Sequence, residues 1–224
     1  MERVRAARRD PATGQHRASR PYSARARAGA NGNRGARLVR LALTASVLAA
    51  SAACQATEYA VDPAHTTIYF AVSHRDISYV RGRFGKLTAK VDFDPVAKAG
   101  SIVVDVDTSS IDTNNATLDG VLRSQFLESE TYPDARFLSE RLVYSGDTLS
   151  AVEGKLWLRG VQRPVTLAAD RFVCREVALG LARQAVCGGA FHAVIRRSDF
   201  GMTRYPGDVG EEIRLEINVE ASRK

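Results

Sequence analysis

The side chains that most often act in catalysis are few and scattered in this chain. After residue 54, the only histidines are His65, His74 and His192. His65 and His74 are nine residues apart on one expected strand and fall on opposite faces, so they cannot share a metal ion without a bulge. The simplest interpretation is three histidines that each make separate hydrogen bonds, and no metal site is predicted.

The motifs of common enzyme classes are also missing from the sequence. It contains no Gly-x-Ser-x-Gly nucleophile motif, no phosphate-binding P-loop and no dinucleotide-binding glycine pattern. Ser198 and Asp199 form half of a nucleophile arrangement, without a neighbouring base. Asp105 and Asp107 share one face of an expected strand, where solvation is the simplest role. These residues favour a binding protein over an enzyme, and no catalytic residue is predicted.

The elements that must position any ligand are strands. Apolar residues alternate with polar ones in most of the chain after Tyr59, which is typical of strands with one buried face. The clearest stretches are residues 65–74, 87–93, 102–106, 152–158, 165–169, 191–195 and 213–219. Turn signals such as Asp94-Pro95 and Arg159-Gly160 separate them.

One segment, residues 115–127, has helical spacing instead. Leu118, Val121, Leu122 and Phe126 would lie on one face, with Asn114 or Asn115 as the cap. About eight antiparallel strands with one short helical insertion predict an all-β closed barrel. A two-sheet sandwich alternates in the same way and stays an alternative. An eight-stranded barrel has room for packed side chains or one elongated ligand.

The charge of the 224-residue chain is unevenly distributed. The formal net charge is +7, but residues 1–40 hold eleven arginines and two acidic residues, a net of +9. The other residues hold 21 basic and 23 acidic groups, a net of −2. No nucleic-acid partner is expected, because a basic surface for phosphate backbones is absent from the part expected to fold.

Residues 41–53 are uncharged, end in small residues and follow Arg37 and Arg40, as in a secretory signal peptide. A 13-residue helix spans about 20 Å, too short for a hydrocarbon core of about 30 Å. A buried core helix is the alternative. Cys54 follows Ala52-Ala53 and could be a lipoprotein cysteine, although Ser51 stands where lipidation signals normally have Leu. Cleavage without lipidation is favoured.

The other two cysteines, Cys174 and Cys187, are thirteen residues apart in a strand-rich segment. An even pair in an exported protein favours a disulfide. Two buried thiols are the alternative.

Several motifs together resemble the YceI-like family of periplasmic polyisoprenoid-binding proteins, which have a lipocalin-like barrel. They lie in order across residues 59–221: 59–65, 70–74, 80–84, 91–95, 119–126, 132–137, 154–165, 197–202 and 209–213. The chain departs from the family pattern at Leu118, Val121 and Gln125, where the family helix is more polar. The residues discussed above predict an Arg-rich segment and signal peptide over residues 1–56, and the resemblance implies a lipid-binding barrel over residues 57–224.

The resemblance further implies an isoprenoid lipid, such as a polyprenyl chain or quinone, as ligand of a carrier or sequestering protein in the periplasm. No other cofactor is expected. Two possible partners are left open: a membrane surface during lipid exchange, and a second copy of the chain in a homodimer. Two alternative functions also stay open: an exported hydrolase or isomerase that uses the same cavity, and a ligand-free structural or stress protein.

The residues expected to line the cavity come from the alternating strands and from the helical stripe. The inward faces carry no titratable pair. The strand residues are Phe70, Phe84, Val91, Phe93, Val104, Phe137, Leu156, Leu158, Leu167, Phe191, Leu215 and Ile217, and the helical residues that close one end are Leu118, Leu122 and Phe126.

Export predicts removal of the signal near residues 53–57, which leaves a slightly acidic mature protein. Mass spectrometry of protein isolated from the periplasm measures the new N-terminus. A chain that keeps its Arg-rich segment would contradict the prediction, and the mass of a diacylated Cys54 would identify an anchored lipoprotein instead.

Overall fold

The computed structural model describes residues 56–179 and 182–224. The expected signal peptide and Cys54 lie outside these residues. The strands are β1 (Thr57–Val61), β2 (Thr67–His74), β3 (Ser78–Phe84), β4 (Leu87–Asp94), β5 (Ala99–Asp107), β6 (Ile111–Asp112), β7 (Asp134–Ser145), β8 (Thr148–Leu158), β9 (Val161–Leu179), β10 (Ala182–Arg196) and β11 (Val209–Arg223). The helical elements are η1 (Thr108–Ser110), α1 (Ala116–Val121), η2 (Leu122–Leu127) and η3 (Arg197–Phe200).

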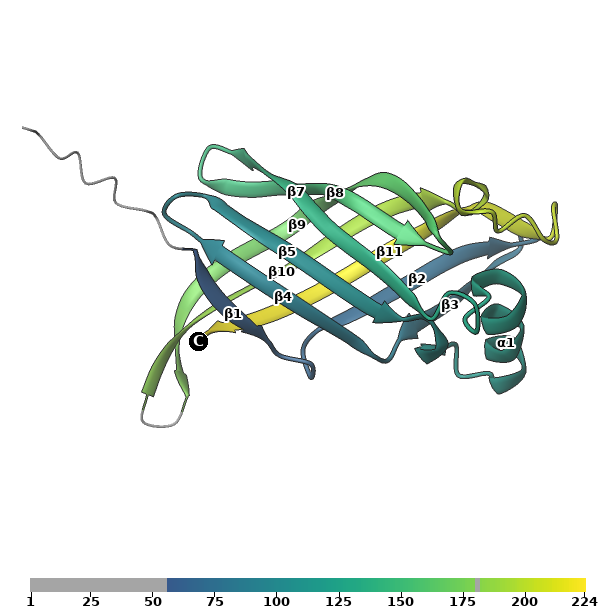
Figure 1. Cartoon of the computed structure of the whole chain (residues 1–224), viewed down its shortest axis with the longest axis horizontal. Coiled ribbons are helices and arrows are strands. Elements are labelled where there is room, and N and C mark those ends of the chain that lie inside the picture. The colour runs from purple at the N-terminus through teal and green to yellow at the C-terminus, as the bar shows by residue number, and fades with distance from the viewer. Residues whose placement is uncertain (1–55, 180–181) are drawn as a thin grey trace, which may run out of the picture. The chain divides into compact units, whose positions relative to one another are not determined.

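Eight of these strands form a closed antiparallel barrel (Figure 1). Their order is β1-β4-β5-β7-β8-β9-β10-β11, and β1 closes the ring by pairing with both β4 and β11. The strands β2, β3 and β6 extend the sheet from β11. The predicted eight-stranded barrel is therefore confirmed, and the sandwich is excluded.

The alternation in the sequence becomes the inside and outside of the barrel. On β11, Ile213, Leu215 and Ile217 are half-buried, whereas the residues between them are exposed. On β10, Phe191, Ala193 and Ile195 are buried between exposed neighbours. Successive side chains of a strand point to opposite faces, so each apolar series faces the interior.

The predicted helical insertion is confirmed as α1 followed directly by a π-helical turn, η2. The Asn115 side chain caps α1 by accepting hydrogen bonds from the backbone N–H groups of Thr117 and Leu118, both at 3.1 Å. Asp119 is buried and accepts from the Thr113 N–H at 2.8 Å and hydroxyl at 2.7 Å. These local hydrogen bonds fix the start of the insertion. The insertion lies at one end of the barrel, beside β3 (Figure 1). In the described part of the chain, no helix has the length and apolar character to cross a membrane.

One expectation about the histidines is wrong. His65 does not lie on a strand with His74, because β2 begins at Thr67. It lies in the turn after β1, where its Nδ1 is 2.7 Å from Oδ2 of Asp62. This carboxylate raises the pKa of His65 by hydrogen bonding and charge. Asp62 holds this turn by accepting from the Ala64 N–H at 2.8 Å through Oδ1 and from the His65 N–H at 3.3 Å through its carbonyl, so β2 begins only after the turn.

Cys174 and Cys187 form a disulfide between β9 and β10. The two residues lie directly opposite each other in the antiparallel register. The predicted pairing is thus confirmed over two separate thiols, and it crosslinks the hairpin at the barrel end opposite α1 (Figure 1).

Thiol labelling of denatured mature protein without reductant should leave Cys174 and Cys187 unmodified. A Cys174→Ser/Cys187→Ser variant should lose about 3 kcal/mol of unfolding free energy, because a closed loop of this size limits the unfolded chain. Urea unfolding measures the loss. Labelling of both cysteines before reduction would show that the disulfide does not form.

Candidate functional site

The barrel encloses an apolar cavity with a volume of about 620 Å³. The structure places all fifteen residues expected to line a cavity around this one, and their contact with a ligand stays a prediction. They lie on β2 (Phe70), β3 (Phe84), β4 (Val91, Phe93), β5 (Val104), α1 (Leu118), η2 (Leu122, Phe126), β7 (Phe137), β8 (Leu156, Leu158), β9 (Leu167), β10 (Phe191) and β11 (Leu215, Ile217).

Sequence reasoning missed part of the lining. Tyr59, Thr66, Leu142, Leu149 and Phe172 also border the cavity. Phe172 lies beyond the short alternating run from which β9 was predicted, while β9 continues to Leu179. Continued alternation would have placed Arg171 inside, because a register shift at Asp170 is what turns Phe172 toward the cavity. Tyr59 and Thr66 required the closure of the ring by β1.

Glycines in the wall explain how the cavity stays open despite its many phenylalanines. A Cβ atom on Gly82 would stand 2.6 Å from Cε1 of Phe70, its partner in the register between β2 and β3. A Cβ atom on Gly154 would likewise stand 2.6 Å from Cζ of Phe137. These rings therefore occupy the space that the missing side chains leave at the wall. Where a ring lies this close to the backbone of a neighbouring strand, only glycine leaves enough space for it.

The insertion closes the mouth of the cavity with an apolar face. Leu118, Leu122 and Phe126 line the cavity from this side. The Phe126 ring stacks on Tyr205, with centroids 5.9 Å apart, and the Tyr205 hydroxyl donates to Oε1 of Gln125 at 2.6 Å. Phe126 and Leu127 are also buried in one hydrophobic cluster with barrel residues, so apolar packing holds the cover together with the stack and the hydrogen bond.

A second tie fixes the end of η2. Glu128 ends η2 with a left-handed backbone, φ 49°, and forms an ion pair with Arg159. The Arg159 guanidinium also donates to the Phe200 carbonyl at 3.1 Å and lies 6.0 Å from the Tyr132 ring centroid. Arg159 thus joins η2, the β8–β9 turn and η3.

A titratable pair lies at the mouth, outside the inward strand faces that alternation predicted. His74, Arg75 and Asp208 border the cavity there. Nε of Arg75 donates to Oδ1 of Asp208 at 2.8 Å, and both side chains are at least half exposed. The pair lies in turns, where alternation carries no information about side-chain direction.

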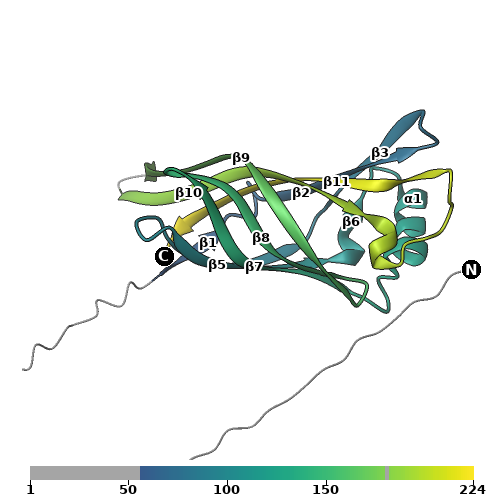
Figure 2. The same cartoon turned by 90° about the horizontal axis from the view of Figure 1, so that it is seen from above.

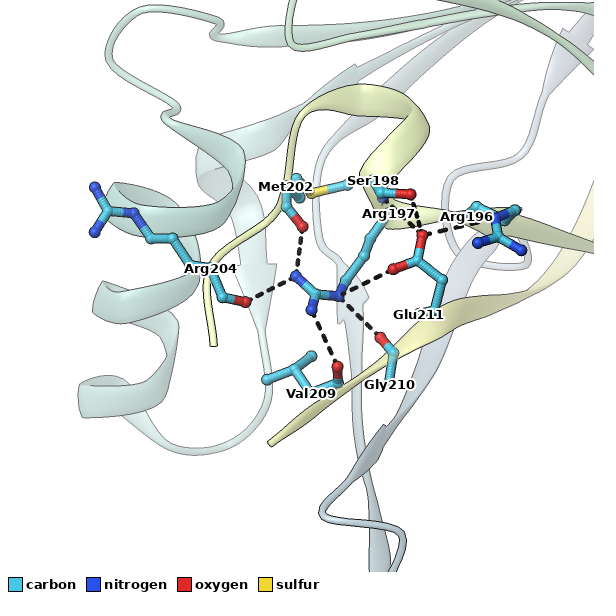
Figure 3. A network of polar contacts seen from close by, with 8 residues as sticks. All are labelled: Arg196, Arg197, Ser198, Met202, Arg204, Val209, Gly210 and Glu211. Atoms are coloured by element: carbon cyan, nitrogen blue, oxygen red, sulfur yellow. Dashed lines mark hydrogen bonds and ion pairs between the residues drawn. The ribbon is translucent and has the colours of Figure 1, made fainter. Parts of the chain in front are cut away.

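A buried arginine organises the loop that follows η3 (Figure 3). Arg197 is only 4% exposed and borders the cavity. Its guanidinium donates to four backbone carbonyls: Gly210 at 3.0 Å, Arg204 at 2.8 Å, Val209 at 3.1 Å, and Met202. A buried charge is tolerated only when its donors are satisfied, so the loop must hold these carbonyls in place.

The nearest carboxylate to Arg197 is a weak partner, because Oε2 of Glu211 is 3.9 Å from Nε. Arg197 also continues the inward series Phe191, Ala193 and Ile195 by two residues. This spacing of two residues was the signal in the sequence that could have placed the Arg197 side chain inside the barrel.

Ser198 has a carboxylate neighbour that the sequence did not reveal. Its hydroxyl and N–H donate to Oε1 of Glu211. These bonds, with Arg196 and Arg197 nearby, lower the pKa of Glu211. A carboxylate whose pKa is lowered is a poor proton acceptor, so the arrangement does not activate the serine. The described residues contain no group of three His, Cys, Asp or Glu side chains able to hold a metal ion.

The two strand aspartates have structural partners. Asp105 accepts from Arg136 at 2.5 Å. Asp107 caps η1 by accepting from the Ser109 N–H at 2.8 Å, and its pKa is lowered first by the Ser109 hydroxyl.

An apolar cavity inside an eight-stranded barrel, with a helical cover at the mouth, agrees with the family comparison, in which a model of the YceI-like domain matches residues 59–221. The chain belongs to the YceI-like domain family. A UPF0312 protein from Vibrio cholerae is 32% identical over 184 residues, which cover 80% of this chain and 95% of that protein.

Solved structures share the fold of this YceI-like protein. The crystal structure of the YceI protein from Campylobacter jejuni superposes with a TM-score of 0.59 at 28% identity, covering 66% of this chain and 87% of that one. A polyisoprenoid binding domain from Saccharophagus degradans gives a TM-score of 0.54 at 16% identity, covering 75% and 99%. The second likeness shows the fold alone.

Arg197→Met should lower the free energy of unfolding by about 3 kcal/mol, because four buried carbonyls lose a charged donor. Arg196→Met is the matched control: Arg196 is exposed and 3.7 Å from Glu211, so its loss should cost about 0.5 kcal/mol or less. Urea unfolding of both variants compares them. Equal losses would show that the buried network does not stabilise the loop.

Proposed function

We propose that this protein binds an isoprenoid-type lipid, a polyprenyl chain or a quinone, inside its barrel and carries or sequesters it in the periplasm. The observation that carries the proposal is the size and apolar lining of the cavity. The barrel acts by binding alone in this proposal, without a catalytic step.

The lining of the cavity favours an apolar occupant over water. Water inside an apolar space finds few hydrogen-bond partners, and the lining here is mostly aliphatic and aromatic side chains. Each CH₂ group of a lipid tail that enters such a space contributes about 0.8 kcal/mol.

The form of the site supports a chain-like ligand with one end at the mouth. Apolar side chains line the barrel, whereas the polar residues His74, Arg75 and Asp208 gather at the mouth. A tail inside and a polar head at the rim match this distribution. The Saccharophagus degradans domain, which shares this fold, is a polyisoprenoid binding domain, and this supports the same ligand class for the present barrel.

The periplasmic location is proposed from the sequence. Residues 41–53 have the apolar run and small-residue end of a signal peptide. The disulfide between Cys174 and Cys187 supports an oxidising compartment.

Organic extraction and native mass spectrometry of purified protein should find a bound isoprenoid. Leu122→Asp should reduce its occupancy several-fold while the barrel stays folded, because an unpaired carboxylate at the mouth disfavours an apolar tail. Ser124→Asp, exposed on the same helical turn, is the control and should keep wild-type occupancy.

Leu156→Asp tests the interior, because Leu156 lies opposite Phe137 in the barrel wall. It should abolish lipid retention together with much of the stability. An empty wild-type protein would favour the ligand-free structural alternative, and a bound ligand that the protein converts would favour the enzyme. Leu122→Asp protein with unchanged occupancy would show that lipid enters elsewhere.

A further inference from the structure

The β2–β3 hairpin carries exposed apolar side chains beside the cavity mouth. Its turn is formed by Arg75 and Asp76, with φ angles of 56° and 52°, and Ile77 follows at 85% exposure. Tyr79 is 46% exposed. The hairpin extends past the barrel rim at the same end as α1 (Figure 2). Arg75 and Val80 border the cavity, so the hairpin forms part of the mouth itself.

Two arginines flank Tyr79 on the outer face of the sheet. The guanidinium carbons of Arg81 and Arg214 lie 5.3 Å and 5.7 Å from the Tyr79 ring centroid. Both residues pair with Ala71 in the register, Arg81 from β3 and Arg214 from β11, so they form one row across three strands. Within the described part of the chain, neither has a carboxylate partner within 4.0 Å.

Two acidic groups beside the hairpin turn are engaged. Asp76 accepts a hydrogen bond from the Ser73 hydroxyl at 3.0 Å, and Asp208 is paired with Arg75. Glu212 and Glu216, two residues before and after Arg214 on the same face, limit the positive potential. The surface therefore offers two guanidinium groups without a carboxylate partner among the described residues, around an aromatic and aliphatic centre, a combination that suits weak and reversible binding.

We propose that Ile77, Tyr79, Arg81 and Arg214 dock the cavity mouth on an anionic membrane surface. Ile77 would enter the boundary between head groups and acyl chains, and Tyr79 would take the amphipathic position that tyrosine favours there. Arg81 and Arg214 would bind lipid phosphates, for which the planar guanidinium is well suited.

This docking places the mouth against the bilayer. The docking deepens the proposed function, and its biological meaning rests on that function. A lipid tail could pass between the bilayer and the cavity while exposing less apolar surface to water. The charged residues at the rim would then meet head groups, while the tail meets the apolar face of Leu118 and Leu122.

Vesicle co-sedimentation tests the surface directly. The full mature protein is mixed with vesicles of phosphatidylglycerol and phosphatidylcholine, and separately with phosphatidylcholine alone, at low and high salt. The variants are Ile77→Asp and Arg81→Gln/Arg214→Gln. Val96→Asp is the control for Ile77→Asp, because Val96 is 90% exposed in the β4–β5 turn. Arg175→Gln/Arg183→Gln is the control for the arginine pair, because both residues are exposed on the β9–β10 hairpin. Both the turn and the hairpin lie at the end of the barrel opposite the mouth.

The wild type should bind the anionic vesicles, less so at high salt. The arginine pair should account for about a 30-fold change in affinity, and Ile77→Asp for about tenfold or more. The controls should bind within about twofold of the wild type. Equal binding to phosphatidylcholine, equal losses in the controls, or unchanged binding by the mouth variants would overturn the proposal.

Native mass spectrometry on the same variants separates this proposal from the proposed function. The docking variants leave the cavity residues intact, so they should keep their bound lipid. Empty wild-type protein that still binds anionic vesicles through this surface would reject the isoprenoid ligand and keep the docking surface. Lipid-filled protein without vesicle binding would reject the docking surface alone.

Discussion

The closure of the sheet by β1 is the constraint on which the rest of this structure depends. Thr57–Val61 pairs with β4 through Tyr59 and Val91, and with β11 through Tyr59 and Arg223. Once the ring is closed, each strand has one face toward a space with little access to water and one face toward solvent. Apolar alternation then becomes a requirement of the interior, because a polar residue inside would lose its hydrogen bonds to water.

Closure creates the interior, but it does not decide whether side chains fill it. The buried residues form three clusters, one around Phe200 and Phe126, one around Tyr59 and Phe93, and one around Phe137. Rings that lie against glycines of the wall leave the space between these clusters open. The two ends differ in how they are held. The disulfide fixes the end near Tyr59, whereas the mouth is held by side-chain packing around Phe126 and by polar contacts such as the Glu128–Arg159 ion pair.

The sequence predicted the strands, the helical insertion and the disulfide, whereas the choice of a barrel over a sandwich needed the ring closure by β1, because both architectures alternate. Alternation is a local property, so residues such as Leu215 and Ile217 could be placed inside without knowledge of their neighbours. Arg75 and Asp208 could not be found in this way, because they are 133 residues apart and meet in turns. The role of Arg197 depends on carbonyls of a later loop, although its spacing from the inward residues Phe191, Ala193 and Ile195 of β10 pointed inward. Cavity volume was out of reach as well, since it depends on the packing of rings against Gly82 and Gly154.

The helical cover has little local stability of its own. Six residues of α1 include Gly120, and the change to a π-helical turn at Leu122 weakens the regular hydrogen bonding. A helix this short depends on tertiary contacts for its stability. These contacts are the burial of Phe126 and Leu127 in the core cluster around Phe200, the Phe126–Tyr205 stack and the ion pair between Glu128 and Arg159. The barrel wall is joined instead by continuous strand ladders, so opening of the cover must separate side-chain contacts but no ladder. Arg197 holds the Tyr205 loop in position for the cover.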